Sequence, residues 1–527
     1  MVPNMHSPKA QACCLAVFAA LAASSANAVH LSPNGTGQVL IFPYYTVRNG
    51  FATLISIDNT QDNIKAVKLR FREGLNGRDV LNFNLFLAPN DTWTGAVVET
   101  INGARLVTND NSCVAPADLF TEVRSDGVGL PLNAFKNYYY SGSNFKDAES
   151  LASLDRTREG YFEVLEMGVI EAGLSPSAAL IVGYVKPAAT SGVPANCAGM
   201  DRYDGYAGNP NSIRFPDIGE PLLSPPTGGL RGRASLIGAS SGTNFSFSPT
   251  ALDAWSSRVA YSNTGDIAGT QLGHAFPATS TVATPAGMIV ASWSNGTDAV
   301  SAVLMRATLT NEFVLDSGTN SQTDWLITFP TKPYYVGVST DQNLMPSPPP
   351  FATGFNANGT GSCDGYDSVV VSREAITPVR EVFAVGVLPP GYVDPNVSNL
   401  CWVANVLPFA NATTPSILGA LASNRLSGYV VADLPRSTTT AGAATTPALR
   451  GVRQGPNGKF TVRFNGAKQR LTPTSAVLVS ASGATSKIPG THFGLPAIGV
   501  MLHNYQNNNV ASKYGGVLEH SYSVRVE

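Results

Sequence analysis

Hydrophobic and polar positions alternate with a period of two along residues 38–99, the spacing of β-strands that have one covered face. In the segment 67–72 every odd position is apolar, and the even positions are Lys68, Arg70 and Arg72, which we expect to face solvent. Asn-Gly pairs tolerate the positive φ angles of tight hairpin turns. The chain has eight of them, at Asn34, Asn49, Asn76, Asn102, Asn295, Asn358, Asn457 and Asn465. We therefore expect short antiparallel strands joined by tight turns.

This pattern predicts a mainly β protein made of antiparallel β-sandwich domains of immunoglobulin-like architecture, with a few short helices. Strand patterns return at 325–335 and, near the end of the chain, at 460–464 and 517–526. The expected helices are 147–158, 248–255 and 298–309.

The N-terminus has the organisation of a secretory signal peptide. His6 and Lys9 supply its potentially positive side chains, and the apolar run CCLAVFAALAA follows at 13–23. That run is shorter than the roughly 20 residues that span a bilayer. Ala-Asn-Ala at 26–28 provides the small residues of a cleavage site, which makes Val29 the expected new terminus. A non-cleaved anchor or a buried helix is the alternative. We expect export to the periplasm, the cell surface or the extracellular medium.

Changes in composition divide the chain into five parts, and the proline run PSPPP marks a stiff extended connector between two of them. The expected parts are a signal peptide (1–28), an N-terminal β-sandwich domain (29–200), a middle α+β region (201–345), a Pro/Gly-rich connector (346–362) and a C-terminal β-rich region (363–527).

Charge is scarce in this sequence. Charged residues make up 13% of the chain, and 34 basic residues stand against 36 acidic ones. Loss of the leader removes Lys9 and changes the formal charge from −2 to −3. Such a chain has no basic surplus to neutralise phosphates, so we expect no nucleic-acid partner. No later segment reaches 18 unbroken apolar residues, so we expect no transmembrane helix in the mature chain.

Four cysteines remain after the leader: Cys113, Cys197, Cys363 and Cys401. An even number in an oxidising compartment indicates two disulfides, and four cysteines allow three pairings. We expect the sequential pairing, which keeps each bridge within one half of the chain. Zinc binding is the alternative, although the sequence has no C-x-x-C pair.

One motif of serine hydrolases is present. Residues 238–242 match G-x-S-x-G with Ser240 at its centre. The motif requires a sharp strand-to-helix turn, whereas the following residues 243–247 have the pattern of a strand. Possible bases lie downstream at His274, His492, His503 and His520, in no recognisable context. We expect a chance match and no catalytic residues, with Ser240 as the only candidate nucleophile.

Paired carboxylates are the second candidate catalytic set, because two of them cleave glycosides. Glu163, Glu166 and Glu171 lie in one strand-like segment. Glu163 and Glu166 would face opposite sides of that strand, which does not favour cooperation. We expect these acids to stand on the solvent side of a sheet.

Metal ligands are not clustered in the sequence. His492 and His503 are eleven residues apart and have no H-E-x-x-H motif. The runs 109–111 and 364–367 contain fragments of calcium loops but lack the full pattern of an EF-hand. We expect no metal site and no cofactor, and leave a structural calcium ion open.

Several stretches resemble an uncharacterised family of exported β-rich proteins of Gram-negative bacteria, often described only as cell-surface proteins. They are QVLIFPYYTVRNGFATLISIDNT from Gln38, KAVKLRFREGLNGRDVLNFNLFLAPNDTWTG from Lys65, REGYFEVLEMG from Arg158, ASLIGASSGTNFSFSPTAL from Ala234, TDWLITFPTK from Thr323 and HFGLPAIGVMLHNY from His492. The resemblance implies a single exported unit and brings no established activity or catalytic residue. It also implies that Ser240 lies in an ordinary strand and turn.

These observations predict a secreted, non-enzymatic protein that acts as a cell-surface, matrix or binding component. Its partner would be a surface polymer, a glycan or a second copy of itself. The alternatives are an exported hydrolase, either a serine esterase or a glycosidase, and a carbohydrate-binding protein. For the last, tyrosines at 44–45 and 138–140 would stack on sugars, although packing under loops is their expected role.

Overall fold

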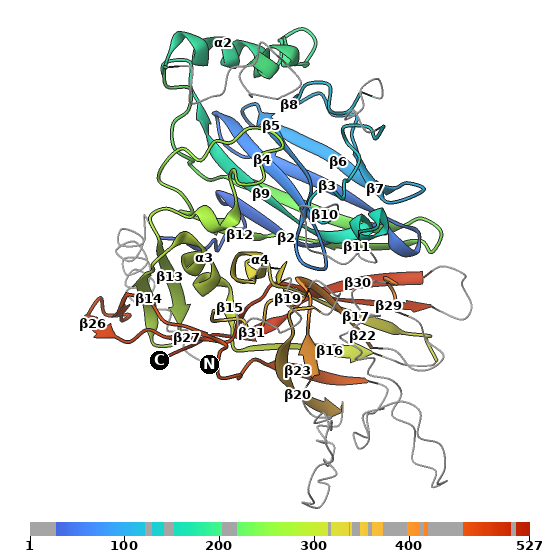
Figure 1. Ribbon diagram of the computed structural model, residues 1–527, viewed down its shortest axis with the longest axis vertical. Helices are drawn as coiled ribbons and strands as arrows, with labels where there is room; N and C mark the ends of the chain where they lie inside the picture. The colour runs from blue at the N-terminus through green and yellow to red at the C-terminus, as the bar shows by residue number, and fades with distance from the viewer. Residues whose placement is uncertain are drawn as a thin grey trace, which may run out of the picture.

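The computed structural model describes residues 28–121, 129–141, 152–202, 219–314, 318–336, 338–339, 348–356, 361–372, 398–409, 416–419, 457–506 and 513–527. The protein is mainly β, as predicted, and its large sheets are antiparallel. Two sandwiches lie one above the other in Figure 1, the first built mostly from early strands and the second mostly from late ones. Residues 1–27, which belong to the expected signal peptide, lie outside the described part. An immunoglobulin-like topology stays a prediction.

The first sandwich packs a seven-stranded sheet on a five-stranded one. The larger sheet has the order β1 (His30–Leu31), β12 (Thr250–Asp253), β2 (Val39–Thr46), β9 (Glu159–Ile170), β4 (Ile64–Glu73), β5 (Asp79–Leu87) and β8 (Cys113–Ala115). The smaller one has the order β11 (Thr243–Phe247), β10 (Leu230–Gly238), β3 (Phe51–Asn59), β6 (Thr92–Glu99) and β7 (Ala104–Val107). The apolar positions of the alternating segments meet between them, where Phe42 stacks on Phe162 with ring centres 4.2 Å apart.

The second sandwich pairs a five-stranded sheet with a four-stranded one. The first of these has the order β21 (Ser398–Leu400), β20 (Asp364–Ser372), β23 (Asn457–Arg463), β16 (Thr308–Val314) and β31 (Ser521–Ser523). The second has the order β22 (Ala404–Phe409), β17 (Gln322–Thr328), β29 (Val500–Gln506) and β30 (Lys513–Glu519). Trp325 is fully buried between the two sheets.

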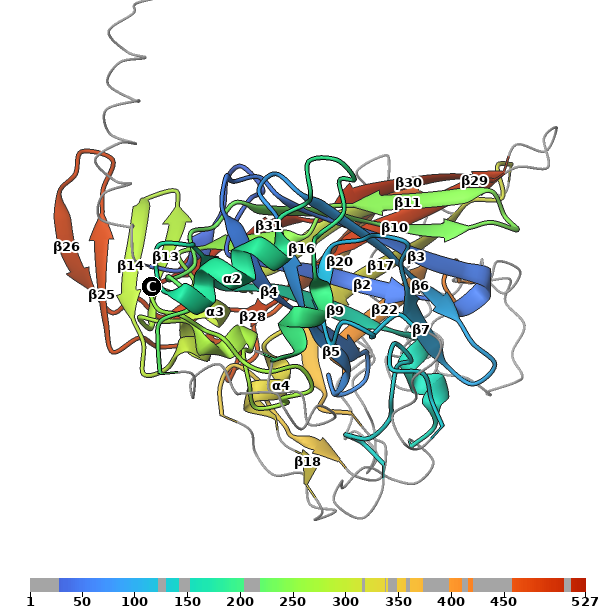
Figure 2. The same cartoon turned by 90° about the horizontal axis from the view of Figure 1, so that it is seen from above.

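The four-stranded sheet belongs to both cores. Trp325 and Met501 pack inside the second sandwich, whereas Leu326 and Leu502, on the other face of the same strands, join the core of the first. Figure 1 and Figure 2 both show β30 beside β11, the edge strand of the first sandwich. A Cβ placed on Gly515 of β30 would lie only 2.7 Å from the ring of Phe245. The two sandwiches therefore form one continuous body.

Smaller elements complete the chain. A four-stranded sheet contains β13 (Thr279–Thr284), β14 (Gly287–Ser292), β25 (Ser475–Val479) and β26 (Thr485–Ile488). Short sheets are formed by β15 (Met305–Arg306) with β28 (Leu495–Pro496), by β18 (Val338–Ser339) with β19 (Phe355–Asn356), and by β24 (Arg470–Leu471), β27 (His492–Phe493) and β32 (Arg525–Val526). The helices are α2 (Pro176–Val185), α3 (Gly296–Leu304), α4 (Lys332–Tyr335) and the 3-10 turns η1 (Arg48–Gly50), η3 (Leu154–Arg158), η4 (Cys197–Arg202) and η6 (Leu272–His274).

The Asn-Gly pairs have more than one role. Gly77 (φ 72°) of the pair Asn76-Gly77 lies in the turn between the paired strands β4 and β5, as predicted, whereas Asn49 (φ 54°) and Gly50 (φ 76°) turn the chain between β2 and β3, which lie in different sheets. Asn295 instead caps α3, where its side-chain oxygen accepts the amide proton of Asp298 at 2.9 Å. Asn457 begins strand β23. An Asn-Gly pair is thus a turn signal only where the flanking strands return on themselves.

Two of the three predicted helices are wrong in type. Residues 250–253 form strand β12, because pairing with β1 and β2 at the sheet edge outweighs local propensity. The described part of 147–158 contains only the 3-10 turn η3. The helix expected at 298–309 is present as α3 but ends at Leu304, where the chain enters β15. Helix α2 was missed, although Ser175 before Pro176 is a recognised start signal.

The predicted solvent face of β4 is wrong. Lys68 and Arg70 have no exposed surface, and Arg72 is 5% exposed. A later segment covers this face: Lys68 Nζ donates to the carbonyl of Asn263 at 2.8 Å, and Arg70 donates to the carbonyl of Asp266 at 2.7 Å. Local alternation shows which residues share a face but does not show what covers that face.

The structural units do not follow the boundaries expected from composition. Strands β10, β11 and β12, which lie in the expected middle region, complete both sheets of the first sandwich. Cys113 is bonded to Cys197 and Cys363 to Cys401, which is the sequential pairing. Of the expected connector 346–362, only residues 348–356 and 361–362 are described.

Candidate functional site

Ser240 lies in the turn 239–242 between the antiparallel strands β10 and β11. A hydrolase elbow joins a strand to a helix. The turn at Ser240 instead joins two paired antiparallel strands and is a β-hairpin turn. The four candidate histidines are all described, and none of them forms a hydrogen bond with the Ser240 hydroxyl. Among the described residues, none of the four candidate histidines is therefore placed as a base for this serine.

His520 is buried in a setting that suits only the neutral ring. Its Nε2 lies 3.0 Å from the carbonyl of Leu326 and its Nδ1 lies 3.2 Å from the side-chain nitrogen of Asn311. The first contact requires a donor at Nε2 and the second an acceptor at Nδ1. Burial lowers the pKa of His520 to about 4.

This histidine should make stability depend on pH. The unfolded chain takes up its proton near pH 6.5, whereas the folded chain does so near pH 4. The free energy of unfolding should therefore fall as the pH drops from about 6.5 to about 4, with roughly 3 kcal/mol due to this residue. Urea titrations across this range should show a shallower fall for His520→Gln. Equal slopes for the variant and the wild type would contradict the assignment.

The acids of β9 are buried and individually paired. Glu163 forms a 3.2 Å ion pair with Arg72, and Glu166 forms a 2.7 Å ion pair with Lys65. Burial raises the pKa of both carboxyls, and their cationic partners oppose the rise. Both glutamates have no exposed surface, so their predicted position on the solvent side is wrong. Each is used to neutralise an internal cation.

In the fragments that resemble calcium loops, the carboxylates accept hydrogen bonds from other groups of the chain. Asp364 accepts from Lys332 Nζ at 3.0 Å and from the amide of Ala352 at 2.7 Å. Asp110 accepts from the hydroxyl of Ser112 at 2.6 Å. Among the described residues, no group of three or more His, Cys, Asp or Glu is placed to hold a metal ion. A structural calcium ion stays a prediction.

The tyrosines singled out for sugar stacking mostly belong to the core. Tyr44, Tyr45 and Tyr140 are at most 1% exposed. Tyr138 and Tyr139 are half-buried and, with Lys136, line a pocket of about 210 Å³. This space is below the usual range of small-molecule sites, about 300–1,000 Å³.

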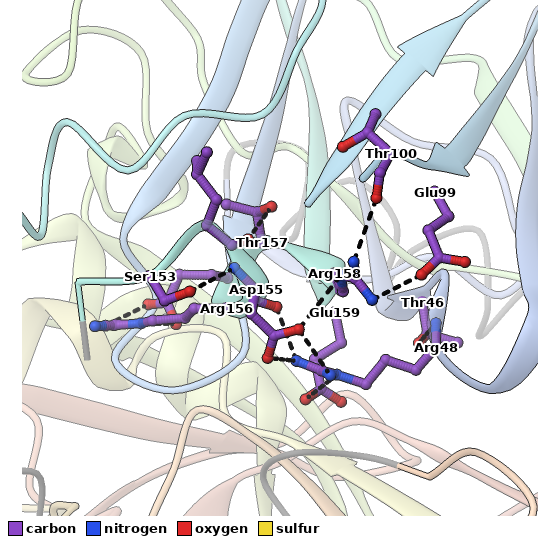
Figure 3. Close-up of polar contacts among 12 residues, drawn as sticks. Thr46, Arg48, Glu99, Thr100, Ser153, Asp155, Arg156, Thr157, Arg158 and Glu159 are labelled. Carbon is purple, nitrogen blue, oxygen red and sulfur yellow. Dashed lines mark hydrogen bonds and ion pairs between the residues drawn. The ribbon is translucent and has the colours of Figure 1, made fainter. Parts of the chain in front are cut away.

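An ionic network fixes one end of the first sandwich (Figure 3). Arg48 contacts Asp155 at 2.8 Å and Glu159 at 3.0 Å, and Arg158 contacts Glu99 at 2.7 Å. These pairs tie the η1 turn and β6 to η3 and the start of β9. The charges satisfy one another, so we assign the network to folding.

A different arrangement occurs where the second sandwich meets the sheet β24–β27–β32, near the C-terminus (Figure 1). A pocket of about 450 Å³ opens there, lined by Arg463, Arg470, Arg525 and Phe493, and we call it the arginine pocket. Its described lining contains no acidic residue. It has the size of a small-ligand site.

Strand register explains how distant arginines meet. In the small sheet, Phe493 lies opposite both Arg470 and Arg525. In the neighbouring sheet, Thr308 lies opposite both Arg463 and Ser523. Directly opposed residues on antiparallel strands project from the same face. Two cross-strand rows therefore contribute to one pocket.

The arginines of this pocket are poorly neutralised. Within the described part of the chain, no carboxylate forms an ion pair with Arg463 or Arg470, and both residues are exposed. Asp367 lies opposite Arg463, but its carboxylate accepts from Asn465 at 2.6 Å. Arg525 pairs with Glu527 at 2.6 Å, with both side chains more than half exposed. Such an exposed ion pair contributes little to stability, and another anion can take the place of its carboxylate.

Arg306 is a further arginine close to the pocket in sequence. It directly precedes Ala307, which lines the pocket, and it is 4% exposed. Its guanidinium donates to the carbonyls of Val303 and Met305, each at 3.0 Å, and lies 3.9 Å from the centre of the Tyr522 ring. Burial lowers its pKa to about 10, so it remains charged at neutral pH.

A second pocket adjoins the first. It measures about 610 Å³ and shares Arg470 with the arginine pocket. Tyr334, Tyr335, Asn295 and Thr472 contribute to its lining, and we call it the tyrosine pocket. Hydroxyl and amide groups line the tyrosine pocket together with one carboxylate, Asp298, whereas guanidinium groups prevail in the arginine pocket. Together the two pockets can contact a ligand longer than one small molecule.

No sequence motif indicates this site. Its three arginines lie in short strands and are spread over residues 463–525. The usable signal is only the basic character of RFNGAKQR from Arg463 and of the tail residue Arg525 in a chain that is otherwise poor in charge.

No protein-family model, curated protein or solved structure matches this chain. The similarity to exported β-rich proteins therefore stays a prediction, and function has to be argued from the geometry of the site. The described helices include none with the length and hydropathy needed to cross a bilayer.

Proposed function

We propose that this chain is an exported, non-enzymatic binding protein of the cell envelope or cell surface, which holds an extended ligand in the arginine and tyrosine pockets. The observation that supports it best is the pair of adjoining pockets that share Arg470 and present binding groups. Two disulfides fit an oxidising compartment. The N-terminal sequence, which has the organisation of a signal peptide, also supports export.

Affinity electrophoresis tests the binding function. The purified full chain is run through gels that contain neutral, acidic or basic polysaccharides, with an inert protein of similar size as the reference. At least one polymer should retard the chain, and Arg470→Ala should reduce the retardation, because both pockets use this residue. Unchanged mobility in every gel would overturn the binding function.

Export and lack of catalysis are tested on the same protein. Fractionation should recover it outside the cytoplasm with Val29 as its first residue. A fluorophosphonate probe should leave Ser240 unlabelled, because none of the described candidate histidines bonds to its hydroxyl. Specific labelling of Ser240 that Ser240→Ala abolishes would support the hydrolase alternative instead.

A second candidate function, the binding of neutral sugars, is favoured by one surface feature. On β29 and β30 the rings of His503, Tyr505 and Tyr514 stack in a row, with centres 5.9 Å and 5.8 Å apart. Tyr505 is 42% and Tyr514 46% exposed. Aromatic rings at a surface offer apolar area and a polar edge to a glycan. Glycan binding that is lost in Tyr514→Ala and retained in Arg470→Ala would select this strip.

A further inference from the structure

We propose that the arginine pocket binds the acidic groups of a polyanionic glycan, with the sugar hydroxyls of the same chain meeting the tyrosine pocket. This inference rests on the proposed binding function and names the chemical class of its ligand. The shared chemistry is an oxyanion on a sugar chain, either a carboxylate or a sulfate.

The first argument is the excess of positive charge. Three arginines line the arginine pocket, and Arg306 directly precedes the lining residue Ala307 in the chain. Within the described ranges, the one carboxylate that engages a lining arginine is that of Glu527, and it is itself more than half exposed. A ligand oxyanion can replace it without stranding a buried charge. In a chain with 13% charged residues, such a cluster is a local feature and does not reflect composition.

The second argument is the type of cation. A guanidinium presents planar paired donors that match the two oxygens of a carboxylate or the oxygens of a sulfate. Arg463 and Arg470 approach the pocket from different sheets, so one oxyanion or two neighbouring ones can be held from two sides.

The third argument is the neutral part of the lining. Phe493 is half-buried beneath Arg525, whose guanidinium carbon lies 4.6 Å from the ring centre. The hydroxyls of Thr308 and Ser523 lie 2.7 Å apart at the pocket. Beyond Arg470, the tyrosine pocket adds Asn295 and Thr472. Hydroxyl and amide groups beside a ring suit sugar hydroxyls, which a simple inorganic anion does not have.

The experiment is affinity electrophoresis or calorimetry of the full chain with four probes: polygalacturonate, dextran sulfate, neutral dextran and polyphosphate. Polygalacturonate or dextran sulfate should bind, and the stronger of the two identifies the preferred oxyanion. Binding should weaken as salt is raised, because screening acts on exposed charges. Neutral dextran should not bind.

Single variants Arg463→Gln, Arg470→Gln and Arg525→Gln should each weaken binding about tenfold or more, the effect of losing one charge-assisted contact. Arg231→Gln is the matched control. Arg231 is an exposed arginine of the first sandwich that pairs with Asp58, so the change in net charge is the same. Unchanged urea midpoints would show that all four variants are folded.

Three outcomes would overturn the proposal: neutral dextran binding as tightly as dextran sulfate, polyphosphate being the only polyanion that binds, or Arg231→Gln weakening binding as much as Arg470→Gln. Binding of a neutral polymer alone would leave the proposed binding function in place. If none of the neutral, acidic or basic polysaccharides binds, both the polyanionic-glycan proposal and the proposed binding function are overturned.

Discussion

Arg156→Met is expected to lower the free energy of unfolding by about 3–5 kcal/mol, the usual cost of breaking a buried ion pair from one side. Arg156 Nε lies 2.6 Å from Glu73, and the two side chains are 3% and 0% exposed. The Arg156 guanidinium lowers the pKa of the Glu73 carboxyl against the opposing effect of burial. Without the guanidinium, Glu73 is left charged in the interior. Urea denaturation at neutral pH measures the loss.

Arg158→Met provides the control two residues away. Arg158 pairs with Glu99 at 2.7 Å, but the two side chains are 20% and 49% exposed. Exposed pairs of this kind contribute about 0–1 kcal/mol. If the two variants lose similar amounts of stability, burial of the Arg156–Glu73 pair is not the cause.

Removal of the first disulfide should have an effect of similar size. The bond between Cys113 and Cys197 closes a loop with a sequence separation of 84, for which the chain-entropy relation gives about 4–5 kcal/mol. The bond joins β8 to η4 and so holds the intervening helix α2 against the sheet. The double variant Cys113→Ala, Cys197→Ala should unfold at a clearly lower urea concentration than the oxidised wild type.

The reduced wild type is the matched comparison for this variant. Reductant should lower the urea midpoint of the wild type by more than that of the double variant, since only Cys363–Cys401 remains to be reduced in the variant. An oxidised double variant with the wild-type midpoint would show that the loop is held by other contacts.

The alternation of apolar residues was enough to predict the strand-rich fold and many individual strands. It could not predict the environment of the second face. Lys68 and Arg70 occupy the polar positions of β4, yet their partners include backbone carbonyls of residues 263–267, far along the chain. Covering of a sheet by a distant loop has no periodic signature.

The candidate site was beyond prediction for a related reason. Arg463, Arg470 and Arg525 meet only because strand register brings the partners of Thr308 and Phe493 to one pocket. Register between strands far apart in sequence depends on the whole packing arrangement. Local motifs indicate other residues, such as Ser240 and Glu163. Their surroundings are a hairpin turn and an internal ion pair.

The sheet common to both sandwiches has a consequence for how the protein is made. The strands of the first sandwich lie between residues 30 and 253, whereas β17, β22 and β29, which complete its core, lie between 322 and 506. Synthesis runs from the N-terminus, so the early strands are made first. Part of their apolar surface stays uncovered until the later strands have been made. Surface of that kind promotes aggregation of partly made chains. We therefore expect the N-terminal half to aggregate when it is expressed alone, because the strands that complete its core come later in the chain.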